Sequence, residues 1–182
     1  MTDQRAEVLF HPVRLRVVQA LIGRELTTQG LAEVLPDVPR ATLYRHVRRL
    51  ADAGIIEVAA TQQVRGRTER TYRLDTAASH LGVEEAAALT PHQHARHLQV
   101  FVASLLEQGL HYLDAPDADP STDGFGYQQV ALWLDDAELV EFAQRLNEAV
   151  LPFAERRPGG GRRRRMLTTM LIPSTDAASD DP

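Results

Sequence analysis

The first half of the chain shows the hydrophobic spacing of helices. Apolar residues recur every three or four positions over residues 5–23, which predicts a first helix. Pro12 lies early in that stretch, so the helix is expected either to span it or to begin there. Thr27 is a suitable N-cap for a short second helix. A third helix is expected between Pro39, which suits a first helical position, and Gly54, which suits a helix end.

Two short runs of β-type residues follow the third helix. Residues 55–58 and 71–74 are expected to form the strands of a hairpin, and the polar residues 62–68 its long tip around Gly66. Helix, tight turn, second helix and hairpin follow one another in the order of a winged helix-turn-helix domain.

The second half combines one long helix with a second group of elements. A capping-box pattern at residues 90–93 predicts a helix that runs to about residue 113. Residues 127–134 and 166–172 are expected to be strands on either side of a helix over 135–155. The first of these strands has apolar residues on both faces, so both faces should be covered.

These elements predict an α+β chain. Residues 1–75 are expected to form a winged helix-turn-helix DNA-binding domain. Residues 76–173 would form a helical dimerisation segment and a small strand-helix-strand domain that could hold an effector. Residues 174–182 are polar and acidic and are expected to be a disordered tail.

Charge is distributed unevenly along the 182 residues. The formal net charge is −5, and all 20 basic residues are arginine. Residues 39–73 nevertheless hold eight arginines against three acidic residues, a local net charge of +5. A basic segment on an acidic chain favours a local surface that binds a polyanion.

Several functional classes are excluded or disfavoured. The chain has no cysteine, which excludes disulfides, thiolate metal sites, iron–sulfur clusters and cysteine nucleophiles. It has no P-loop, dinucleotide-binding glycine pattern or nucleophile elbow, so neither an enzyme nor a bound cofactor is expected. No apolar run is long enough to cross a membrane, and the polar start lacks a secretory signal. We therefore expect a cytoplasmic protein with no membrane partner.

The third helix carries the candidate DNA contacts. Leu43, Val47 and Leu50 share one face, which leaves a face of guanidinium and hydroxyl groups opposite. Residues near the helix start should approach base edges in the major groove, and these are Arg40, Thr42, Tyr44 and Arg45. Residues further along or in the hairpin should contact phosphates or the minor groove, and these are Arg48, Arg49, Arg65, Arg67 and Arg70. The simpler alternative is that these arginines are only solvated.

An ordered set of segments carries a family resemblance. The segments are His11–Arg16, Ala41–Leu50, Ala53–Ile56 and Arg67–Leu74. Together, residues 11–74 resemble the winged-helix domain of ArsR-type bacterial transcription regulators. The resemblance implies a dimeric, cytoplasmic, DNA-binding regulator that releases or rearranges on a signal. The chain departs from the metal-sensing branch because it lacks cysteine and has about 100 further residues, which resemble a C-terminal domain of larger regulators of this type.

The second half offers three further sets of candidates. A broad apolar face on the long helix could be intramolecular core, pair with a second copy of the chain, or do both. Its residues are Leu98, Phe101, Val102, Leu105 and Tyr112. Tyr127 and Trp133 could line a small-molecule effector pocket. His94, His97 and His111 are weak candidates for metal ligands, because a third or fourth ligand would have to come from elsewhere, and packing is the commoner role.

The sequence therefore predicts a homodimeric regulator that binds double-stranded DNA at an inverted repeat and represses transcription, with a small-molecule effector as a further partner. One alternative is a winged helix that binds another protein. The other is a metal-responsive regulator that uses histidines.

Overall fold

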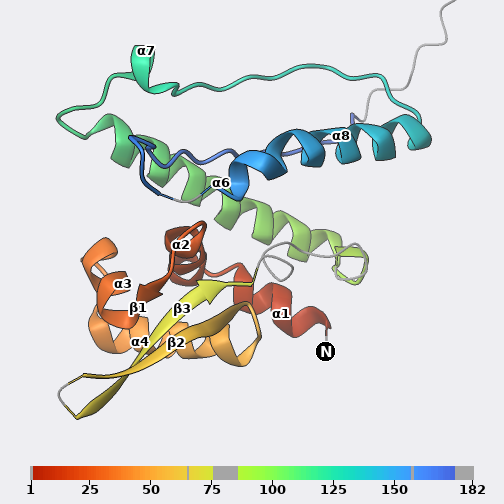
Figure 1. The fold of residues 1–182 in the computed structure, drawn as a ribbon. Helices are drawn as coiled ribbons and strands as arrows, with labels where there is room; N and C mark the ends of the chain where they lie inside the picture. The colour runs from red at the N-terminus through yellow and green to blue at the C-terminus, as the bar shows by residue number, and fades with distance from the viewer. Residues whose placement is uncertain (1, 65, 76–85, 157, 175–182) are drawn as a thin grey trace, which may run out of the picture. The chain divides into compact units, whose positions relative to one another are not determined.

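The computed structural model describes residues 2–64, 66–75, 86–156 and 158–174. Its contacts divide the chain into two units that meet between Asp135 and Asp136. Figure 1 colours the elements in chain order. The first unit contains α1 (Thr2–Leu9), α2 (Pro12–Leu21), β1 (Leu26–Thr27), α3 (Thr28–Val34), α4 (Arg40–Asp52), β2 (Ile56–Val64), β3 (Arg67–Leu74), α6 (Pro91–Leu113) and α7 (Pro120–Asp123). The second unit contains α8 (Asp136–Ala154).

A break at Pro12 separates α1 from α2, so the first predicted helix is two helices. Proline has no N–H to donate to the carbonyl of Val8, and it holds the preceding residue His11 in an extended conformation (φ −124°, ψ 135°). The side chain of Arg14 donates instead to the carbonyls of Val8 and Glu7. The expectation that a helix begins at Pro12 is confirmed, and the residues before it form a helix of their own.

The core of the first unit lies among α2, α3 and α4. Its fully buried side chains include Val17, Leu21, Leu31, Leu43, Val47, Leu50, Ile55 and Ile56. The predicted cap of α3 is confirmed, because the Thr27 side chain accepts a hydrogen bond from the Gly30 N–H at 3.1 Å. Before α4, the Arg16 guanidinium of α2 donates to both carboxylate oxygens of Asp37 at 2.7 Å each, which fixes the turn between α3 and α4.

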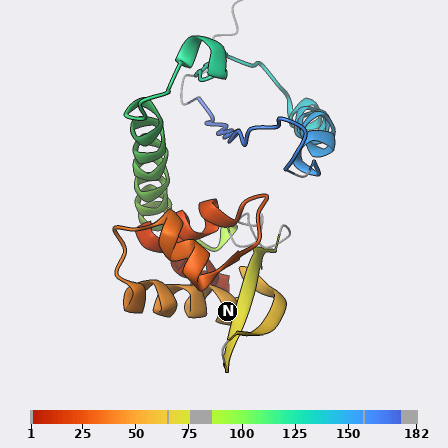
Figure 2. The ribbon, with the colours of Figure 1, turned by 60° about the vertical axis from the view of Figure 1, so that its left-hand side comes forward.

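Three antiparallel strands form a sheet in the order β1-β3-β2. The hairpin of β2 and β3 is longer than predicted, because pairing continues to Val64 and Arg67 instead of stopping near residue 58. The residues expected to form a loose tip are polar, but strand pairing needs only their backbone groups. A side-chain hydrogen bond of 2.9 Å between Gln63 and Thr68 also joins the strands there. The hairpin therefore projects beyond the helices as a wing (Figure 2).

The long helix α6 begins and ends as predicted. Thr90 and Gln93 form a capping box at its start, and the helix runs to Leu113. One face packs on the first unit, where Val100 and Phe101 contact its core and polar and ring contacts add to the packing. Ser104 forms hydrogen bonds of 2.7 and 3.0 Å with Gln19 of α2, and the His97 ring stacks on Phe10 with 4.5 Å between centroids. In the described ranges, no helix combines the length and apolar character needed to cross a membrane.

The predicted strand-helix-strand domain is wrong for the residues that the structure describes. The helix forms as α8, but residues 127–134 and 166–172 have no regular secondary structure. Their apolar side chains are exposed, as at Val130 and Ile172, each with 66% of its surface accessible. Neither segment has a neighbouring strand among the described residues, and an extended segment cannot satisfy its backbone groups alone. The predicted domain boundaries at 75 and 173 stay predictions, and tail residues 175–182 lie outside the described ranges.

Candidate nucleic-acid interface

The two faces of α4 differ sharply in chemistry. Leu43, Val47 and Leu50 are buried as predicted, and His46 is buried beside them. Thr42 is half-buried, and the remaining outward residues are exposed. These are Arg40, Ala41, Tyr44, Arg45, Arg48 and Arg49. The helix thus presents an arginine-rich surface because its apolar residues recur at helical spacing.

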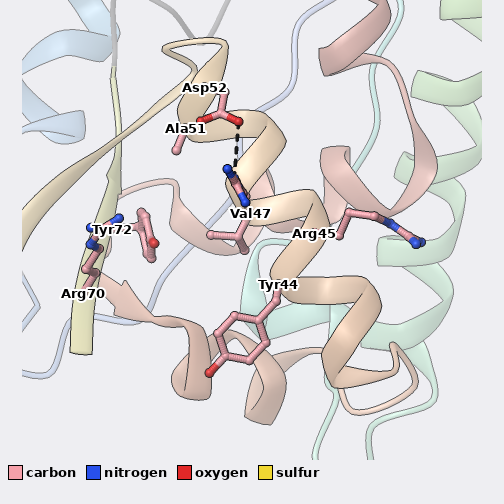
Figure 3. Close-up of a pocket in the computed structure, with 8 residues that line it drawn as sticks. Tyr44, Arg45, Val47, Ala51, Asp52, Arg70 and Tyr72 are labelled. Atoms are coloured by element: carbon pink, nitrogen blue, oxygen red, sulfur yellow. Dashed lines mark ion pairs between the residues drawn. The ribbon is translucent and has the colours of Figure 1, made fainter. Parts of the chain in front are cut away.

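A shallow groove of about 680 Å³ separates α4 from the wing. Tyr44, Arg48 and Asp52 line it from the helix, and Arg70 and Tyr72 line it from β3 (Figure 3). The Arg48 Nε atom lies 3.8 Å from a carboxylate oxygen of Asp52, and both side chains are exposed. Such an exposed pair contributes little, so Arg48 can exchange this partner for another anion at small cost.

Arg45 also lies among the residues that line the groove from α4. In Figure 3 its side chain extends away from Arg70 and Tyr72. Four of the arginines predicted to contact DNA form no ion pair with any other residue that the structure describes. These are Arg40, Arg45, Arg49 and Arg70. Their positive charges are therefore available to an external anion.

The wing positions its arginines by register. Arg70 is exposed and lies opposite Thr61 of β2. Arg67 lies opposite Val64 near the tip, but its side chain is not described, and Arg65 falls outside the described residues. At the base of the wing Arg73 forms a 2.6 Å ion pair with Glu57, which compensates its charge within the chain. Arg70 is thus the wing arginine with a described side chain that is exposed and has no ion pair within the described residues.

A buried cluster of basic groups lies behind α4, and sequence reasoning missed it. Arg14 and His46 are only 5% and 6% exposed, and Arg14 Nη1 lies 3.5 Å from His46 Nδ1. The His11 and His46 rings stack at a tilt with 4.6 Å between centroids. The helix break at Pro12 is the signal that could have revealed the cluster, because it frees two carbonyls that need a buried donor.

The pKa of His46 is lowered to about 4 by burial first and then by the neighbouring positive charges of His11, Arg14, Arg45 and Arg49. The pKa of His11 is lowered for the same reasons, burial first and then three arginines. His46 is therefore neutral near pH 7 and can accept the Arg14 hydrogen bond at Nδ1. This contact fixes the inner face of α4 to the junction of α1 and α2.

The candidate dimerisation residues do not share one environment. Leu98 and Val102 are exposed, whereas Phe101 packs against the core. Leu105 is half-buried, and Tyr112 stacks on Phe125 and donates to Asp123 at 2.9 Å. The exposed apolar stripe of α6 differs from the predicted dimerisation residues and extends further toward the end of the helix. It consists of Leu98, Val102, Leu106, Leu110 and Leu113.

The remaining candidates are dispersed. Tyr127 and Trp133 are 93% and 83% exposed, so the described residues form no enclosure around either ring. His97 is buried in its stack on Phe10, His94 Nε2 lies 3.1 Å from the Ala86 carbonyl, and His111 is exposed. In the part of the chain that the structure describes, no three histidine or acidic side chains gather closely enough to hold a metal ion.

Comparison with known proteins bears on the first unit alone. Residues 9–59, which span α2, α3, α4 and the start of β2, match a family model described as a helix-turn-helix domain, of ArsR-like type. No characterised protein matches the chain significantly. A helix-turn-helix domain implies DNA binding, and families of this kind are typically regulators rather than enzymes.

Proposed function

We propose that this chain is a sequence-specific DNA-binding transcriptional regulator that acts as a homodimeric repressor. The observation that carries the proposal is the exposed arginine face of α4, flanked across a groove by Arg70 of the wing. A helix of this width fits the major groove of B-DNA, and a hairpin beside it can reach the adjacent backbone.

The proposed contacts divide by position. Arg45 lies in the first half of α4, and its side chain extends away from Arg70 and Tyr72 (Figure 3), so its guanidinium would form two hydrogen bonds with guanine. Arg40, Thr42 and Tyr44 would lie over neighbouring bases. Residues near the groove and the wing would contact phosphates or the minor groove, and these are Arg48, Arg49, Arg65, Arg67 and Arg70. The weak Arg48–Asp52 pair supports this role for Arg48, because DNA phosphate would replace the carboxylate.

The exposed stripe of α6 supports dimerisation. Five large apolar residues from Leu98 to Leu113 face solvent along one side of a helix whose other side is packed on α2. Pairing two such stripes about a two-fold axis would remove this apolar surface from water. The dimer would place two α4 helices in successive major grooves, ~34 Å apart, on an inverted repeat. Binding there would block a promoter, and a small-molecule effector acting on the second half of the chain would relieve the block.

The experiment that tests the proposal is selection from random DNA with the purified full-length protein at two salt concentrations. The expected result is an enriched inverted repeat whose affinity falls steeply with salt, because arginine–phosphate contacts release counterions. Replacing Arg45 with alanine should abolish the enrichment at one position of each half-site. The matched variant Arg96→Ala, which removes an exposed arginine from α6, should select the same repeat as the wild type. Failure to enrich any sequence would overturn sequence-specific recognition.

A protein-binding module is the second candidate, and exposed apolar residues on α8 favour it. Val140 and Phe153 are more than half exposed within their own unit. An apolar protein contact should be insensitive to salt, whereas DNA binding should not. Salt-insensitive association together with absent DNA enrichment would favour this alternative.

A further inference from the structure

A basic segment in the second unit has no role in the interface described above. Residues 156–165 hold six arginines and no acidic residue, a net charge of +6 within ten positions. The preceding residues 136–155 hold five acidic residues and one arginine, a net charge of −4. Positive and negative charges are therefore not interspersed along the second unit, because its positive charge is concentrated in one segment.

The described part of this segment is exposed and lacks regular structure. Gly160 and Gly161 adopt the left-handed conformation (φ +61° and +75°), and Arg162 closes the turn by donating its backbone N–H to the Gly159 carbonyl at 3.2 Å. Four consecutive arginines, Arg162 to Arg165, then follow without a helix or strand. Residues 166–174 add no further charge.

The spacing of these charges favours an extended polyanion over a small anion. Four consecutive exposed arginines outside a helix or strand spread their positive charge along the backbone. Duplex DNA presents phosphates along both walls of each groove, so its negative charge is spread out in the same way. Arginine also forms paired hydrogen bonds with phosphate and enters narrow minor grooves.

We propose that the described residues 158–165 of this segment, through Arg162 to Arg165, form a second, sequence-independent DNA contact, which binds duplex outside the site covered by α4 and the wing. This inference rests on the proposed DNA-binding function. Once α4 is bound, the same chain holds the basic segment near flanking DNA at high effective concentration. The segment thereby adds affinity and salt dependence without adding sequence information.

The test compares two full-length variants that each lose two exposed arginines. Arg164→Gln with Arg165→Gln removes charge from the basic segment, and Arg96→Gln with Arg145→Gln removes equal charge from α6 and α8. Binding to fluorescent duplexes of one fixed sequence is measured by anisotropy over a range of salt. The duplexes are about 20 bp, enough for two half-sites, and about 40 bp, which adds flanks.

On the longer duplex, the basic-segment variant should reduce the slope of log affinity against log salt by ~0.9 for each lost phosphate contact, up to ~1.8. On the shorter duplex the basic-segment variant should have the same salt slope as the wild type. The control variant should have the wild-type slope on both duplexes. An unchanged slope on the longer duplex, while the wild type binds it with a steep slope, overturns this proposal alone. If the wild type binds neither duplex, the proposed function fails and this inference with it. Loss of binding to anionic vesicles or single-stranded RNA, with duplex binding unchanged, would assign the segment to another polyanion and also overturn the proposal.

Discussion

Acidification should destabilise the first unit through His46. The pKa of this residue is lowered from 6.5 to about 4, mainly by burial and then by His11, Arg14, Arg45 and Arg49, all basic residues. Between these two pH values the unfolded chain binds a proton at this position and the folded chain does not. The free energy of unfolding therefore falls as the pH falls from 6.5 to 4 and is constant in this respect above 6.5.

The magnitude follows from the size of the shift. One pKa unit corresponds to about 1.4 kcal/mol, so the contribution at pH 5, some 1.5 units below the unfolded pKa, is about 2 kcal/mol. The full contribution by pH 4 is about 3 kcal/mol. Asp37, whose pKa is lowered by its hydrogen bonds from Arg16, contributes stability that is lost only below its ordinary value of 3.8, outside this window.

Two glutamine variants isolate the effect. His46→Gln keeps an oxygen that can accept from Arg14 but cannot be protonated, and His111→Gln removes an exposed histidine of α6. Urea unfolding followed by circular dichroism at pH 7, 6 and 5 gives the free energies. The wild type and His111→Gln should each lose at least about 2 kcal/mol between pH 7 and 5, because the lowered pKa of His11 acts in the same direction, and His46→Gln should lose about 2 kcal/mol less than either. An equal loss in all three proteins would refute the assignment.

Three further substitutions test local features by their effect on the free energy of unfolding. Arg14→Met leaves the Val8 and Glu7 carbonyls without their donor and should cost about 2–4 kcal/mol in urea unfolding; a cost no larger than that of Arg96→Met would contradict the buried role. Thr90→Ala should cost about 1 kcal/mol, since it removes the capping box of α6, whereas Thr90→Ser should be nearly neutral in thermal unfolding; equal melting temperatures for the two would argue against the cap. Gly54→Ala places a side chain at φ +67° and should cost about 1 kcal/mol, and Gly54→Asn should cost less because asparagine tolerates this conformation; the reverse order would contradict the helix end at this residue.

Features encoded by neighbouring residues were predictable from the sequence. The start of α6 depends on Thr90, Pro91 and Gln93, which act within one helical turn, and it forms where expected. The α4 helix likewise lies between Pro39 and Gly54, and its buried face follows from apolar spacing. The arginine-rich outer face followed from the same helical spacing, because the positions opposite the apolar residues are mostly arginine.

Features that depend on distant partners were not predictable in the same way. Residues 127–134 and 166–172 have the apolar pattern of strands, but a strand also needs a neighbour, and a sequence pattern does not supply one. The wing extends to Val64 because β3 pairs with it, although its side chains are polar. The contact between Arg14 and His46 joins residues 32 positions apart, and only the proline break hinted that a buried donor was needed there.

The central claim is that α4 recognises the DNA sequence through base contacts, while the wing contacts the phosphate backbone of the DNA. The most direct test is the ratio of affinities for the selected repeat and for a scrambled duplex, measured for Arg45→Ala and Arg70→Gln at several salt concentrations. Arg45→Ala should lower the ratio by roughly 5- to 150-fold, equivalent to about 1–3 kcal/mol. Arg70→Gln should weaken both affinities alike and reduce the salt slope by about 1. Wild-type binding by both variants would contradict the assignment of α4 and the wing to DNA.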